Sequence, residues 1–192
     1  VQFFDSLVNL PQLSYDHYPV NQSGDKVFLN DHFWSNLETI SAEARRVGKP
    51  FWAFALATAH GSYPIPTIDH LRLQLYADLA YGAQCLQYFT YWNPGTETWN
   101  FHQAPVTQDG LRSPVYELVR EMNREIQARA DVFLGAQVTS VRHTGKDIPM
   151  GTQRLENLPP HIIQLDTHGQ GALVSCLTNK GKEYVVIQNT SV

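Results

Sequence analysis

The sequence predicts an α/β fold with parallel strands, followed by a smaller antiparallel β region. Three segments rich in strand-forming residues, 13–18, 50–58 and 84–92, alternate with stretches of helical character. The segment 50–58 is nearly all apolar, which is typical of a strand buried on both faces of a parallel sheet. After Phe133 the pattern changes to weak alternation with turn signals, which favours antiparallel strands.

Length and composition narrow the class of protein. The 192 residues suit one ordinary domain, or one domain with a fragment of another, and 43% hydrophobic residues suffice for a core. Eighteen acidic residues against fourteen basic ones, with no basic run, argue against a nucleic-acid-binding surface. No apolar run reaches the roughly 18 residues of a membrane span. No Cys or His cluster has zinc-site spacing, so we expect no metal and no cofactor.

The first residue indicates whether the chain is part of a longer polypeptide, and the two cysteines raise the question of a disulfide. The chain begins at Val1 without a methionine or a visible signal peptide, so we expect it to be a piece of a longer polypeptide. Cys85 opens an apolar strand and is expected to be a buried small side chain. A disulfide with Cys176 is the open alternative.

The elements before residue 50 have clear signals. Residues 1–8 are expected to form the end of a helix, and 20–29 a polar loop. Asn30 or Asp31 is expected to cap a helix whose apolar residues recur at steps of three and four. Gly48 ends this helix.

The next two helices are equally well marked. Thr67 is expected to cap a helix that ends at Gly82 and turns four residues inward: Ile68, Leu71, Leu75 and Leu79. A loop of about twenty residues, 93–112, is long enough to suggest a functional role. Ser113-Pro114 is a favourable helix start, and that helix is expected to reach Ala130.

The tail is expected to be antiparallel β structure. Four segments carry strand signals, the last two as a hairpin: 137–143, 162–166, 171–178 and 183–188. We therefore divide the chain into a region of strand–helix units, 1–134, and a β-rich C-terminal region, 135–192.

The residues that follow the strands favour one of two folds. Consecutive strand–helix units with parallel strands fit a doubly wound sheet or a (β/α)8 barrel. A doubly wound nucleotide-binding sheet carries a Gly-rich turn directly after a strand. The strand ends here read Tyr-Asp-His-Tyr-Pro, Ala-Thr-Ala-His-Gly and Thr-Tyr-Trp-Asn-Pro, with no such turn. Aromatic and polar side chains at these ends are typical of a barrel, whose active site lies at the carboxyl ends of its strands.

Five short groups of residues follow one another along roughly the first 130 residues. They are Tyr15-Asp16-His17-Tyr18-Pro19, Phe33-Trp34 with Asn36-Leu37-Glu38, Pro50-Phe51-Trp52, Leu79-Ala80-Tyr81-Gly82-Ala83, and Tyr88-Phe89-Thr90-Tyr91-Trp92. Together they resemble the last three βα units of a clan A (β/α)8 glycoside hydrolase. The likeness is to its β-galactosidase-like, bacterial polysaccharide-degrading members.

The resemblance implies a C-terminal part of a TIM barrel, with its sixth, seventh and eighth strands, followed by the start of an antiparallel β-sandwich. The first five strands, and the acid/base glutamate that follows the fourth, would then belong to a missing N-terminal part or to a second chain. The implied activity is hydrolysis of O-glycosyl bonds in a poly- or oligosaccharide. The implied location is periplasmic or secreted.

The carboxylates depart from the family pattern. Clan A enzymes carry a nucleophilic glutamate at the end of the seventh strand, where this chain reads Ala57-Thr58-Ala59-His60. Since glycoside hydrolysis generally uses two carboxylates, Asp16 is the best remaining catalytic candidate, as base, nucleophile or acceptor from a sugar hydroxyl. The alternative is that Asp16 only braces His17, the loop backbone or an arginine. Glu97, in the long loop, is a weaker candidate.

Aromatic and imidazole side chains supply the candidate substrate-binding set. Its members are His17, Tyr18, His60, Tyr91, Trp92 and Trp99. By the resemblance, Trp92 floors the sugar subsite, where an indole stacks on the C–H face of a sugar. Trp34 and Trp52 are expected to be packing residues.

Two other functions are left open by the sequence. The missing glutamate motivates the main alternative, a non-catalytic carbohydrate-binding barrel that lacks the seventh-strand nucleophile. The third hypothesis is a metal-dependent barrel enzyme that uses Asp16, His17 and His60, because imidazole and carboxylate groups are common metal ligands.

Overall fold

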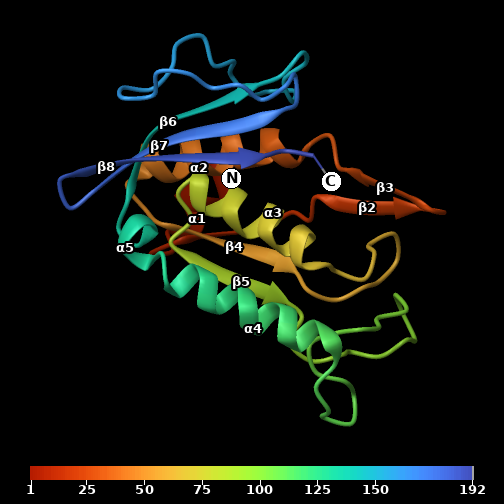
Figure 1. The fold of residues 1–192 in the computed structure, drawn as a ribbon. Helices are drawn as coiled ribbons and strands as arrows, with labels where there is room; N and C mark the ends of the chain where they lie inside the picture. Colours follow the sequence, from red (N-terminus) through yellow and green to blue (C-terminus); the bar gives the residue numbers. More distant parts are fainter. Residues whose placement is uncertain (192) are drawn as a thin grey trace.

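The computed structural model describes residues 1–191 and arranges eight strands in three sheets (Figure 1). The elements in chain order are α1 (Gln2–Val8), β1 (Leu13–Asp16), β2 (Val20–Ser23), β3 (Lys26–Leu29), α2 (Phe33–Val47), β4 (Phe51–Leu56), α3 (Ile68–Ala80), β5 (Cys85–Phe89), α4 (Pro114–Gln127), α5 (Ala130–Phe133), β6 (Gln137–Thr144), β7 (Ala172–Asn179) and β8 (Lys182–Asn189). Within residues 1–191, no helix combines the length and the apolar character that a membrane crossing requires.

The three predicted parallel strands are confirmed. They form one sheet in the order β1-β4-β5, with β4 in the centre. Leu13 lies opposite Phe51, and Trp52 lies opposite Cys85, so the three strands enter the sheet at the same level. All three carboxyl ends therefore meet at one edge, which is the geometry that a shared site at the strand ends requires.

Capping residues set the helix boundaries largely as the sequence indicates. The Thr67 hydroxyl accepts from the backbone N–H of His70 at 3.2 Å, and the Ser113 hydroxyl accepts from that of Val115 at 3.1 Å. Gly48 ends α2 with a left-handed φ of 66°. The predicted cap of α2 at Asn30 or Asp31 was wrong: His32 is the capping residue, and Asn30 accepts from the His32 backbone N–H.

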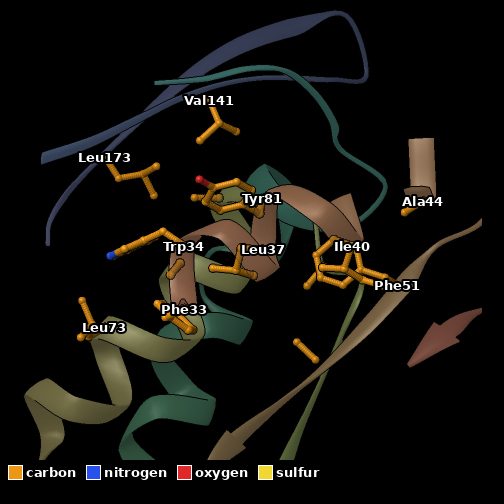
Figure 2. Close-up of a cluster of buried hydrophobic side chains, with 14 of the residues drawn as sticks. Phe33, Trp34, Leu37, Ile40, Ala44, Phe51, Leu73, Tyr81, Val141 and Leu173 are labelled. Atoms are coloured by element: carbon orange, nitrogen blue, oxygen red, sulfur yellow. The ribbon is translucent and has the colours of Figure 1, made fainter. Parts of the chain in front are cut away.

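Helices α2 and α3 lie between the parallel sheet and the antiparallel sheet β6-β7-β8 (Figure 1). Figure 2 shows the cluster that joins these layers, in which α2 contributes Phe33, Trp34 and Leu37. Leu173 of β7 belongs to the same cluster as Leu13 of β1, so one continuous core spans both regions of the chain. The regions before and after residues 134 and 135 therefore share part of their core.

Helix α3 is buried on two sides, whereas its sequence suggests a single stripe of buried apolar residues. Leu71 and Leu75 pack toward Ala55 of β4 and α4 as predicted. Leu73 is also buried, in the cluster that contains Leu173. Gln188 of β8 donates its side-chain amide to the Leu73 carbonyl at 2.8 Å. The antiparallel sheet β6-β7-β8, which follows α3 in the chain, thus covers a second face of this helix.

Several sequence-based boundaries need correction. The polar loop predicted at 20–29 is the hairpin β2–β3, whose turn uses Gly24 at φ 58° as its first central residue. Residues 162–166, expected to alternate weakly as a strand, form none. The predicted helix 114–130 divides into α4 and α5. The C-terminal hairpin is confirmed, with β7 and β8 paired in register from Ala172↔Asn189 onward.

The two cysteines are free thiols, so the alternative of a disulfide was wrong. Cys85 is only partly buried, not fully buried as predicted. It lies opposite Trp52, which is also partly exposed although it is on the central strand of the sheet. The face of the parallel sheet that carries Trp52 is therefore incompletely covered by the described residues.

A buried polar network joins the two regions. The Tyr81 hydroxyl donates to Glu38 Oε1 at 3.0 Å, and His143 Nε2 lies 3.0 Å from the same hydroxyl oxygen. Because the hydroxyl has one proton, which Glu38 accepts, Nε2 of His143 must donate. Nδ1 of His143 is buried without a partner in residues 1–191. The network ties α2 and the end of α3 to β6.

We expect His143 to make stability fall in acid. Its side chain is 0% exposed, and this burial lowers its pKa from 6.5 to about 4. The neutral imidazole therefore contributes stability that is fully present above pH 6.5 and is lost as the pH falls toward 4. The contribution amounts to about 3 kcal/mol in the free energy of unfolding.

Urea unfolding of the full-length protein at pH 7, 5.5 and 4 tests this expectation. His143→Asn should show a shallower loss of stability in acid than the wild type. His168→Asn is the matched control, because the His168 side chain is 88% exposed. Parallel pH profiles of the wild type and His143→Asn would contradict the assignment.

Candidate functional site

The candidate site is the edge where β1, β4 and β5 end. The backbone pairing continues past the strands, since Ala57 N–H donates to the Phe89 carbonyl at 2.7 Å. The Thr58 hydroxyl then donates to the Thr90 carbonyl at 3.1 Å and accepts from the Thr90 N–H at 3.0 Å. These bonds fix the first residues of both loops relative to each other, which is what a preorganised site needs.

An aromatic cluster lies on this frame, with His60 at its centre. The ring of His60 is 4.5 Å from that of Phe101, 4.9 Å from that of Tyr63 and 5.8 Å from that of Phe89. Tyr18, from the end of β1, lies 5.6 Å from Tyr63 and 6.0 Å from Phe89. The connections after all three strands therefore meet in one cluster. The sequence did not identify Tyr63 or Phe89, although Phe89 lies in the aromatic run of the third strand.

The hydrogen bond of His60 defines what this ring offers to a ligand. Nδ1 of His60 lies 3.0 Å from the Thr58 carbonyl oxygen. A carbonyl only accepts, so Nδ1 carries the proton in the neutral ring and Nε2 is an acceptor. An acceptor beside aromatic rings suits a sugar hydroxyl.

Asp16 and Tyr18 stand together at the end of β1. Asp16 is exposed, and its carboxylate has no hydrogen-bond or ion-pair partner among residues 1–191. Within the described part of the chain, no contact supports the alternative that Asp16 braces an arginine. Burial, and then the nearby charge of Asp16, raises the pKa of Tyr18, so its hydroxyl stays protonated and can donate.

His17 points elsewhere. Asn36 of α2 donates to His17 Nδ1 at 3.2 Å, and the imidazole stacks on Phe33 at 6.2 Å. Nε2 is buried without a partner in residues 1–191. Burial lowers the pKa of His17, which favours the neutral ring. The contacts of His17 are with α2, whereas those of His60 are with the loops after β4 and β5, so the structure separates the two histidines that the sequence placed together.

The three aromatic residues after β5 are exposed. Trp92 pairs its backbone with Val106, and Tyr91 accepts from the Val106 N–H at 2.9 Å. Trp92 remains 49% exposed and Tyr91 64% exposed. Trp99 is 62% exposed, and its carbonyl accepts from the Gly61 N–H at 3.1 Å. Trp34, in contrast, is buried, as predicted for a packing residue.

The structure offers no arrangement for the metal-dependent alternative. Across residues 1–191, no three His, Cys, Asp or Glu side chains converge as metal ligands. Carboxylates are also few near the strand ends. The residues after β4, Ala57, Thr58 and Ala59, are buried and not acidic, and Glu97 is exposed in the loop after β5. The site therefore offers Asp16, hydroxyls, imidazole and aromatic faces, which is a chemistry suited to binding a polyhydroxylated ligand.

Two large cavities lie away from this edge. One of 980 Å³ is lined by β6, β7, β8 and the 153–162 segment, and one of 860 Å³ lies between β8 and α3. Neither includes Asp16 or His60. Asp16, Tyr18 and His60 lie at the open edge where the strands end. The candidate site is therefore this edge and neither of the two cavities.

Similarity to known proteins identifies the family of this chain. No curated protein matches the chain. The solved structure of a polyextremophilic β-galactosidase from the Antarctic haloarchaeon Halorubrum lacusprofundi is similar, with 20% identity and a TM-score of 0.46 over 65% of this chain. The chain spans 20% of the length of that protein. A family model described as β-galactosidase, glycoside hydrolase family 42, matches residues 1–129. The chain therefore belongs to this β-galactosidase-like family of clan A glycoside hydrolases.

Proposed function

We propose that this chain forms part of a glycoside hydrolase that cleaves O-glycosyl bonds in a β-galactoside-containing oligo- or polysaccharide. The observation that carries the proposal is the convergence of Tyr18, His60 and Phe89 at one sheet edge beside the unpaired Asp16. Stacking faces and hydroxyl partners are the two contacts that a sugar ring needs. The description of the family as β-galactosidase supports this choice of substrate.

Within that enzyme, we place β1, β4 and β5 as the sixth, seventh and eighth strands of a TIM barrel. Support comes from two incompletely covered surfaces. Trp52 and Phe54 on the central strand are partly exposed. Helix α1 exposes Phe3, at 77%, and Leu7, at 68%. The remaining strands of a barrel, supplied by an N-terminal part or a second chain, would cover both surfaces.

The same proposal assigns the other parts of the chain. Residues 1–134 are the barrel portion, and 135–192 begin the antiparallel β-sandwich that follows it. The acid/base group is contributed from outside this sequence, and Asp16 is the carboxylate that this chain supplies. A periplasmic or secreted location remains a prediction from the family resemblance.

One observation favours a second candidate, a carbohydrate-binding barrel without hydrolytic activity. The end of β4, where family members of this clan carry the nucleophile, presents Ala57, Thr58 and Ala59, all of them buried. None of these side chains is a carboxylate. A protein with this edge and no other nucleophile would bind sugars without turnover.

An assay of the full-length protein separates the two candidates. We expect it to release 4-nitrophenol from the β-galactoside of a panel of 4-nitrophenyl glycosides, and reducing ends from β-linked galacto-oligosaccharides. Calorimetry with the same oligosaccharides runs in parallel. Binding without product release would support the non-catalytic barrel, and neither binding nor release would overturn both candidates.

A further inference from the structure

We propose that Trp99 is an outer sugar-binding platform, so that the enzyme prefers oligosaccharides extending beyond the cleaved linkage to single-sugar aryl glycosides. This inference rests on the proposed function. It names a specificity-determining residue outside the cluster around His60.

Backbone hydrogen bonds place Trp99 beside the candidate site. Ala59 N–H donates to the His102 carbonyl at 3.1 Å, and His102 N–H donates back to the Ala59 carbonyl at 3.0 Å. Gly61 N–H donates to the Trp99 carbonyl at 3.1 Å. The loops after β4 and β5 therefore run together, with Trp99 adjacent to the residue that follows His60. Figure 1 shows these two loops side by side beyond the carboxyl ends of the strands.

A partly buried neighbour, Phe101, holds the loop while the indole of Trp99 stays exposed. The Phe101 ring is 4.5 Å from His60 and 6.0 Å from Phe89, and its backbone N–H donates to the Gly95 carbonyl at 3.2 Å. Phe101 anchors the loop in the aromatic cluster. Trp99, two residues earlier, keeps 62% of its surface exposed. An exposed indole on an anchored backbone is preorganised, which reduces the entropy lost when a ligand binds.

The surroundings of Trp99 favour a sugar over a protein partner. Glu97, Thr98 and Asn100, the neighbours of Trp99 in the sequence, are exposed polar residues. The segment that carries the stacking face thus also carries hydrogen-bond donors and acceptors, and a sugar ring uses both kinds of contact. A protein-binding centre would instead place apolar residues together and exclude charge. Continuity with the His60 cluster identifies the occupant as a further unit of the same carbohydrate chain.

Kinetics of the full-length enzyme test the platform. The variants are Trp99→Ala and Trp99→Phe, with Leu111→Ala as matched control, because Leu111 is 63% exposed in the same connection. The substrates are 4-nitrophenyl β-galactoside and a β-linked galacto-oligosaccharide of four to six units. We expect Trp99→Ala to raise KM for the oligosaccharide roughly tenfold, which corresponds to the loss of one stacking contact. Trp99→Phe should restore part of this loss, and Trp99→Ala should change KM for the aryl glycoside much less than KM for the oligosaccharide.

The inference is overturned if Trp99→Ala affects both substrates equally or neither, or if Leu111→Ala has the same effect. Failure of the proposed function would look different, because the wild type would then cleave neither substrate. In that case the oligosaccharide dissociation constant from calorimetry decides: a roughly tenfold increase in Trp99→Ala supports the platform, and an unchanged value rejects it.

Discussion

Replacing Asp16 by asparagine is expected to lower kcat of the full-length enzyme at least about a hundredfold, with a smaller change in KM. A positioned carboxylate that transfers a proton or stabilises developing charge contributes roughly 10² to 10⁴ in rate. Among residues 1–191, Asp16 is the only carboxylate at the end of the parallel strands, and it has no partner there that would neutralise it. Asparagine keeps the shape of the side chain but removes its charge and replaces one acceptor oxygen by an NH2 donor.

The control for this substitution is Asp25→Asn, in the exposed turn between β2 and β3. It removes the same charge outside the site and should leave both kinetic constants unchanged. The pH dependence of kcat separates the roles, because a general base that is lost removes its limb of the profile. A kcat within a factor of about three of the wild type would exclude a role for Asp16 in chemistry.

Replacing Trp34 by alanine is expected to destabilise the protein by about 3 to 5 kcal/mol, the cost of removing a large buried aromatic side chain. Trp34 is 3% exposed. Its ring lies 4.9 Å from Phe33 within α2 and 5.1 Å from His143 on β6, both edge to face. The indole therefore fills the junction between the helix layer and the antiparallel sheet, and its loss weakens both regions at once (Figure 2).

Trp99→Ala provides the matched comparison, since it removes the same side chain from an exposed loop. Urea unfolding of the full-length protein should show a change below about 0.5 kcal/mol for Trp99→Ala, as for other surface substitutions. A loss below about 1 kcal/mol for Trp34→Ala would mean that the two layers do not depend on this contact. Loss of only the β6-β7-β8 transition would show instead that the two regions unfold independently.

Local signals explain which parts of the fold were predictable. Thr67, Ser113 and Gly48 act on their own helices, so the sequence around each residue suffices to place a boundary. The hairpin β2–β3 was missed because its strands have four residues each, too few for a clear period. The second buried face of α3 was not predictable from its own residues, because Leu73 is covered by β7, which comes about a hundred residues later.

The site shows the same division between local and tertiary information. The strand positions of Asp16 and His60 place them at one edge, and that much follows from the alternation of strands and helices. The orientation of each side chain does not follow. His17 and Tyr18 are adjacent in sequence but turn to different partners, α2 for His17 and the loops after β4 and β5 for Tyr18. Tyr63 joins the cluster through the fold of its loop, which no spacing in the sequence reveals.

The most direct test of the account is a crystal structure of the full-length protein with a bound galacto-oligosaccharide. We expect the sugar at the carboxyl ends of β1, β4 and β5, with one ring stacked on an exposed tryptophan. A sugar hydroxyl should lie within hydrogen-bond distance, about 3 Å, of Asp16 or of Nε2 of His60. A sugar bound instead in the cavity between the antiparallel sheet and the 153–162 segment, with the strand ends empty, would contradict the central claim.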